Sequence, residues 1–108
     1  TSIYILATIP TTGKATFNYP IVYGVGTLKL YDYATDTLLN EITISVTDNY
    51  FDFAMPTLSN GKYYFLFDEN LVINEYGSVS IANKDVWSFE ISDGEFYNTE
   101  FSNEFLIN

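Results

Sequence analysis

Carboxylates gather in three polar stretches of this chain, where they could bind a cation or carry out acid–base chemistry. The three stretches are Asp32 with Asp36, Asp48 with Asp52, and Asp68-Glu69-Asn70. Calcium takes about six to eight oxygen ligands, yet no stretch matches the D-x-[DN]-x-[DN]-G calcium loop. A glycosidase pair can be drawn from any two of fourteen carboxylates, so such a match carries no weight. We therefore interpret each stretch as a solvated turn and expect no metal site and no cofactor.

Histidine and cysteine are both absent from the sequence. Without His the chain lacks the usual general base at neutral pH, and Ser or Thr cannot form a hydrolytic triad. Without Cys it can form neither a disulfide nor a thiolate metal site. We therefore expect a protein that is not an enzyme and has no catalytic residue.

The charge balance is strongly acidic, with fourteen carboxylates, four Lys and no Arg giving a formal net charge of −10. Nucleic acid is a poor partner, because binding it requires a basic surface. An anionic membrane surface is disfavoured for the same reason. The apolar runs are also too short to span a bilayer. The expected partners are therefore other proteins, with nucleic acid and membrane excluded.

Aromatic side chains, which make up 19% of the residues, are the remaining groups that could bind a partner. A tyrosine on an outward strand position can stack on a sugar ring or contact another subunit, because it has a rigid face and a polar tip. The tail after residue 100 is apolar, so we expect it to dock on its own sheet or on a neighbouring subunit. The candidate contact residues are Tyr31, Tyr33, Tyr50, Tyr64, Phe101, Phe105, Leu106 and Ile107.

Strands must position these side chains, because period-two alternation recurs along most of the chain. The clearest case places Ile42, Ile44 and Val46 on one face, so residues 27–47 predict a β-hairpin. Asp48-Asn49, Asn60-Gly61 and Asp93-Gly94 are turn signals. The other predicted strands cover residues 3–9, 15–19, 50–55, 63–67, 71–73, 78–82, 86–91 and 95–101.

The run NGKYYFLFD at residues 60–68 is the most aromatic part of the chain. Its alternation places Tyr63, Phe65 and Phe67 in the core, and Tyr64 and Leu66 against a loop or a neighbour. Folding must offset an ordering cost of about 1.5 kcal/mol per residue, so a small domain has to bury its Phe residues. The predicted core is Phe17, Leu28, Leu30, Ile42, Ile44, Phe51, Phe53, Phe65, Phe67, Trp87 and Phe89.

Residues 27–67 resemble immunoglobulin-like and transthyretin-like β-sandwich modules. Such modules often run strand, Asp-containing turn, strand, aromatic-x-aromatic, Leu-x-x-Gly-x-Tyr, strand, and residues 58–63 (LSNGKY) supply the Leu-x-x-Gly-x-Tyr motif. The Cys pair of true immunoglobulin domains is missing, so no antibody-like or receptor kinship is implied. The resemblance and the strand pattern predict one all-β domain over residues 1–108, an immunoglobulin-like antiparallel β-sandwich of about 7–9 short strands. A small β-barrel is the alternative.

Compact, acidic, Cys-free modules of this kind look like accessory proteins of bacteriophage virions, such as capsid decoration and fibre proteins. The resemblance implies a structural protein at the virion surface whose partners are capsid or fibre subunits, or further copies of itself. The alternative from another class is a small carbohydrate-binding or adhesion module that uses Tyr31, Tyr33 and Tyr64.

Overall fold

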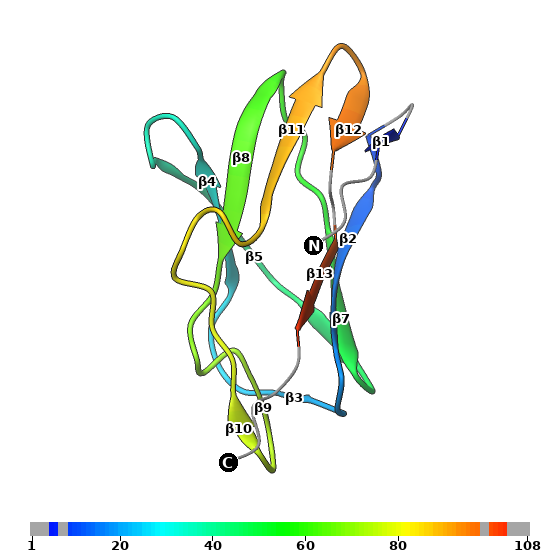
Figure 1. Ribbon diagram of the computed structural model, residues 1–108, viewed down its shortest axis with the longest axis vertical. Helices are drawn as coiled ribbons and strands as arrows, with labels where there is room; N and C mark the ends of the chain where they lie inside the picture. Colours follow the sequence, from blue (N-terminus) through cyan, green and yellow to red (C-terminus); the bar gives the residue numbers. More distant parts are fainter. Residues whose placement is uncertain (1–4, 7–8, 98–99, 104–108) are drawn as a thin grey trace.

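The computed structural model describes residues 5–6, 9–97 and 100–103, and these residues form an all-β sandwich (Figure 1). Within this described part of the chain, strands β1 to β13 are arranged in three sheets, none of which closes into a barrel. Among the described residues there is no helix, and hence no helix long enough to cross a membrane. The predicted β-sandwich is confirmed, although its strands are shorter and more numerous than the seven to nine expected.

The first layer is a six-stranded sheet in which every neighbouring pair is antiparallel. Its order is β1 (Ile5–Leu6), β12 (Glu95–Tyr97), β11 (Ser88–Ser92), β8 (Gly61–Leu66), β4 (Leu28–Asp32) and β5 (Leu38–Ile42). The aromatic strand β8 therefore lies in the middle of this sheet. It pairs with β4 on one side and β11 on the other, as expected for the most apolar strand.

The second layer is a four-stranded sheet, which lies on the right in Figure 1. Its order is β13 (Glu100–Asn103), β2 (Thr12–Phe17), β7 (Tyr50–Ala54) and β6 (Ser45–Thr47). β13 and β2 run parallel, while the other two pairs are antiparallel.

A third, three-stranded sheet lies at one end of the sandwich, at the bottom of Figure 1. Its order is β10 (Gly77–Ser78), β9 (Val72–Asn74) and β3 (Val22–Tyr23). The two-glycine segment of residues 21–26 supplies β3. It is held by hydrogen bonds from Gly24 N to Leu71 O and from Val25 N to Asn70 O.

Two predicted turns close two-residue hairpins. At Asp93-Gly94, Ser92 pairs with Glu95, and both turn residues have left-handed φ angles of 51° and 82°. Asp and Gly tolerate this conformation, which matches the twist of the flanking strands. Asp48-Asn49 also forms a two-residue loop, between β6 and β7, in which only Asp48 has a left-handed φ, of 49°.

The core between the two layers is built from stacked and edge-on aromatic rings. Trp87 is fully buried, and its ring centroid lies 4.5 Å from that of Phe65 and 5.7 Å from that of Phe53. All eleven predicted core residues are buried, which confirms that set. The core also contains Ala15, Ile21, Tyr63, Leu71, Val72, Ile81, Ile91, Phe96 and Phe101.

The hairpin predicted over residues 27–47 is correct only as far as Ile42. β4 and β5 pair with each other, with a register shift between Leu30 and Tyr31. The chain then leaves the six-stranded sheet, and β6 pairs with β7 in the other layer. Ile42 and Ile44 are both buried because the two facing sheets share one core, so the alternation continues although the sheet changes.

The last described strands are also divided between the two layers. The strand predicted over residues 95–101 is two strands, β12 in the six-stranded sheet and β13 in the four-stranded sheet. Of residues 78–82, only Ser78 lies in a strand, at the end of β10, and Ile81 forms an isolated bridge with Phe67. β11 begins at Ser88, so Trp87 enters the core from the preceding turn.

Candidate functional site

Three surface features could bind a partner, and the first is a tyrosine cluster on the outer face of the six-stranded sheet. We use this name for Tyr31, Tyr33 and Tyr64 together with Asp36 and Lys84. β4 carries Tyr31, Tyr33 follows β4 directly, and β8 carries Tyr64 opposite Tyr31. Tyr31 and Tyr64 are stacked with centroids 5.0 Å apart and an interplanar angle of 8°, and Tyr33 meets Tyr64 edge-on at 5.9 Å.

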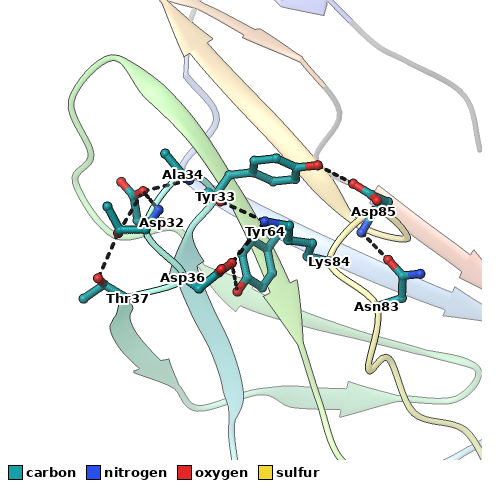
Figure 2. A network of polar contacts seen from close by, with 10 residues as sticks. Asp32, Tyr33, Ala34, Asp36, Thr37, Tyr64, Asn83, Lys84 and Asp85 are labelled. Carbon is teal, nitrogen blue, oxygen red and sulfur yellow. Dashed lines mark hydrogen bonds and ion pairs between the residues drawn. The ribbon is translucent and has the colours of Figure 1, made fainter.

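The turn after β4 places the charged groups of this cluster. Oδ1 of Asp32 accepts hydrogen bonds from the backbone N–H groups of Ala34 and Thr35, each at 3.0 Å. Asp36 then adopts a left-handed φ of 58°, which short Asp side chains tolerate. This conformation directs the Asp36 carboxylate towards Tyr64 and Lys84 (Figure 2).

Polar contacts close the cluster. The Tyr64 hydroxyl donates to Asp36 Oδ1 at 2.9 Å, and the Lys84 ammonium donates to the same oxygen at 3.2 Å and to the Tyr33 carbonyl at 3.1 Å (Figure 2). The Tyr33 hydroxyl donates to Asp85 at 2.5 Å. The ammonium groups of Lys62 and Lys84 also lie over the Tyr33 ring, 4.0 and 4.2 Å from its centroid.

The contacts around Tyr64 and Asp36 shift the pKa values of these two groups in opposite directions. Burial, and then the hydrogen bond to Asp36, raises the pKa of Tyr64 to about 12. The hydrogen bonds from Tyr64 and Lys84 lower the pKa of Asp36 below the ordinary aspartate value. Both shifts stabilise the neutral phenol beside an ionised carboxylate, which is the pair that Figure 2 shows.

The predicted contact residues are not equally accessible. Tyr64 is only 4% exposed, and Phe101 lies in the core beside Phe17 and Trp87, so neither side chain can meet a partner in this arrangement. Tyr31 and Tyr33 are half-buried. Tyr50 is in the other sheet, where the Lys14 ammonium lies 4.5 Å from its ring centroid. Phe105, Leu106 and Ile107 lie outside the described residues.

The second feature, which sequence reasoning missed, is an apolar groove at the end of the sandwich. It is a hollow of about 350 Å³ lined by Tyr19, Pro20, Ile21, Val22, Ile73, Asn74, Glu75 and Tyr76. The segments before and within β3 form one wall, and β9 with the following turn forms the other. Tyr19 and Tyr76 have ring centroids 4.6 Å apart.

Exposed apolar side chains line this groove or lie up to three residues further along the chain from its lining residues. Val22, Tyr23, Val25, Ile73 and Tyr76 make up five of the nine large apolar residues that are exposed in the described part of the chain. A signal for them was present in the run IVYGVG at residues 21–26, which is too apolar for an ordinary loop. Its two glycines are equally typical of a bend, so the run does not by itself predict an exposed surface.

The third feature is a polar groove of about 450 Å³, which lies beside β4 and the end of β8 in the six-stranded sheet. It is lined by Lys29, Tyr31, Leu66, Phe67, Asp68, Glu69, Asn70, Ser80, Ile81 and Ala82. It contains one of the predicted contact residues, Tyr31, and the carboxylate stretch at 68–70. Within the described residues, no three His, Cys, Asp or Glu side chains are placed to hold a metal ion.

Comparison with known proteins does not add to this picture. No protein family, curated protein or solved structure matches the chain.

Proposed function

We propose that this chain is a non-enzymatic structural protein that docks onto a larger assembly. The docking surface is the apolar groove together with the exposed apolar side chains Val22, Tyr23, Val25, Ile73 and Tyr76. A virus particle is the assembly that we favour, with the chain as a capsid decoration or fibre-associated protein on its surface. The resemblance of its acidic, Cys-free β-sandwich to phage accessory proteins supports this choice of assembly.

The observation that carries the docking proposal is the concentration of exposed apolar side chains at one end of the molecule. Val22 is 58% exposed and lines a hollow that a partner's side chain could fill, and Val25, three residues further along the chain, is 65% exposed. Scattered single apolar residues on a surface need no explanation, whereas a contiguous patch is typical of an interaction site. Fully burying a Val or Ile side chain contributes about 1.5–3 kcal/mol, so covering several half-exposed ones contributes a few kcal/mol.

The positions of the charges indicate the chemistry of the partner. All four lysines are in other places: Lys14 on Tyr50, Lys29 near Asp68, and Lys62 with Lys84 on Tyr33. The groove carries Glu75, in a protein of net charge −10. A partner surface with apolar side chains surrounded by Lys or Arg is therefore complementary in both respects.

The test is incorporation into the native assembly. We expect the untagged protein to purify from its source at fixed stoichiometry with a larger particle. A Val22→Asp/Ile73→Asp variant should lose that association, because both residues line the groove and the change places two charges in the proposed interface. Leu39→Asp is the matched control, since Leu39 on β5 is as exposed as Ile73 (42% and 40%) but lies outside the groove.

Both outcomes of the comparison are informative. The double variant and the control should keep the melting temperature of the wild type, because the substituted side chains are exposed. A double variant that still enters the particle would remove the apolar groove from the interface. A native protein that exists only as a free monomer would contradict the proposed function as a whole.

A further inference from the structure

The polar groove is a preformed site, because backbone hydrogen bonds hold both of its loop walls. Phe67 and Ile81 exchange hydrogen bonds of 3.3 and 2.9 Å, which fix residues 80–82 against the end of β8. Leu71 N donates to Asp68 O at 3.1 Å, and Val25 N donates to Asn70 O at 2.9 Å, which fix residues 68–70. A ligand would therefore meet walls that need little ordering, which lowers the entropic cost of binding.

One wall of the groove contains an aromatic ring in a fixed orientation. Tyr31 is stacked on Tyr64, and Tyr64 is itself held by Asp36. The tyrosine cluster thus acts as a support for Tyr31, the one member of the cluster that lines the groove. A ring supported in this way offers a flat apolar surface at low cost in side-chain entropy.

The opposite walls supply polar groups that the protein leaves uncommitted. Within the described part of the chain, the side chains of Glu69, Asn70 and Ser80 take part in no hydrogen bond. The contact of Lys29 with Asp68 is long, at 4.0 Å, and Asp68 is largely exposed. Carboxylate, amide, hydroxyl and ammonium groups therefore surround the same hollow, with both hydrogen-bond donors and acceptors available.

We propose that the polar groove binds a neutral saccharide. A sugar ring has an apolar face of C–H groups that packs on an aromatic side chain, and hydroxyl groups around its edge that both donate and accept hydrogen bonds. Tyr31 provides the first contact, and Asp68, Asn70 and Ser80 provide the second. The groove volume of about 450 Å³ lies within the range of roughly 300–1,000 Å³ that small-molecule sites occupy.

Charge and polarity argue against other ligand classes. An anionic sugar or a phosphate would meet Asp68 and Glu69 in a protein of net charge −10. A purely apolar ligand would leave the polar walls unpaired, which is costly when they are covered. This inference is independent of the proposed function, because the polar groove and the apolar groove are lined by different residues.

The experiment is a titration of the full chain with the neutral oligosaccharides maltotriose, cellotriose and chitotriose, followed by amide chemical shifts in NMR spectra. We expect at least one of them to give saturable shifts at residues 68–70 and 80–82. Trigalacturonate, which is anionic, should bind more weakly. Tyr31→Ala should lower the affinity at least about tenfold, which corresponds to about 1.4 kcal/mol.

Variants separate a binding role from a structural one. Asn70→Ala/Ser80→Ala changes only exposed side chains, so it should keep the melting temperature and still weaken binding. Tyr50→Ala, on the other sheet, should bind as the wild type does. The proposal is overturned if none of the oligosaccharides binds, or if Tyr31→Ala and Asn70→Ala/Ser80→Ala both bind unchanged. Val22→Asp/Ile73→Asp, which changes only residues that line the apolar groove, should still bind sugar, and this distinguishes the result from a failure of docking.

Discussion

Tyr64 shows how one side chain can look like a surface residue and act as a structural one. It alternates with Tyr63 and Phe65 on β8 and therefore points away from the core. Yet Tyr31, Tyr33 and the Lys84 side chain cover it, and its hydroxyl donates to Asp36. The cluster is a small second core on the outer face of the sheet.

This environment predicts a specific loss of stability in alkali. The folded-state pKa of Tyr64 is raised to about 12 from an ordinary value of 10.0. Because the pKa of Tyr64 is higher in the folded protein than in the unfolded chain, the stabilisation by its neutral phenol is complete at pH values below 10.0. This stabilisation is lost as the pH rises through the folded-state pKa of about 12. Between pH 10.0 and 12 the wild type should therefore lose free energy of unfolding more steeply than Tyr64→Phe, as measured by urea unfolding at successive pH values.

A second variant checks the cause of this shift. Asp36→Asn removes the negative charge beside the phenol, so the pKa of Tyr64 should fall and the alkaline loss should become shallower. Asn tolerates the left-handed backbone at this position, so the turn itself should be kept. Equal slopes in the wild type and Tyr64→Phe would show that Tyr64 is not coupled to folding.

Among the elements, β2 and β7 depend on each other through Gly13. Gly13 pairs with Phe53, and a Cβ atom added at Gly13 would lie 2.2 Å from the tip of the Phe53 ring. The ring cannot move away easily, because Phe51, Phe65 and Trp87 surround it. The glycine is needed here for space, since an aromatic ring occupies the place of its missing side chain.

Gly13→Ala should therefore destabilise the protein by about 1–3 kcal/mol, the usual cost of overpacking a core. The measurement is the free energy of unfolding in denaturant. Thr12→Ala, at the exposed neighbouring position, should change it by less than about 0.5 kcal/mol. The double variant Gly13→Ala/Phe53→Leu should lose less free energy of unfolding than the sum of the losses in the two single variants, because the smaller Leu side chain leaves room for the added methyl group. An unchanged stability in Gly13→Ala would show that the ring is free to move.

For the molecule as a whole, the dominant electrostatic feature is self-repulsion. The net charge is −10, and the lysines are too few to neutralise the carboxylates locally. The ion pairs of Lys29 and Lys84 are partly exposed and contribute little. Repulsion among the remaining carboxylates favours the expanded, unfolded chain.

Salt should therefore stabilise the folded state. The Debye length is about 8 Å at physiological ionic strength and shortens further as salt is added. We expect a higher melting temperature at about 0.5 M sodium chloride than at about 0.02 M, as measured by calorimetry. No change with salt would mean that the carboxylates are too far apart to repel one another.

The core and the turns could be predicted because each depends on local sequence. Alternation identified Phe51 and Phe53 as buried, since successive strand residues point to opposite faces. Asp93-Gly94 was recognisable as a turn, because its left-handed φ angles favour those two residue types. The tyrosines of the outer face were found as a group, but their packing against Lys84 was not, because that contact joins residues about fifty positions apart.

The amino-acid sequence alone determined that this chain forms short strands, where most of them turn, and which faces meet in an aromatic core. Only the tertiary structure decided which sheet each strand joins, as in the division after Ile42 and the one between Tyr97 and Phe101. The physical reason is that alternation in a strand is the same whichever sheet it pairs with. Strand partners, and the two grooves that depend on them, are set by long-range packing that no local pattern encodes.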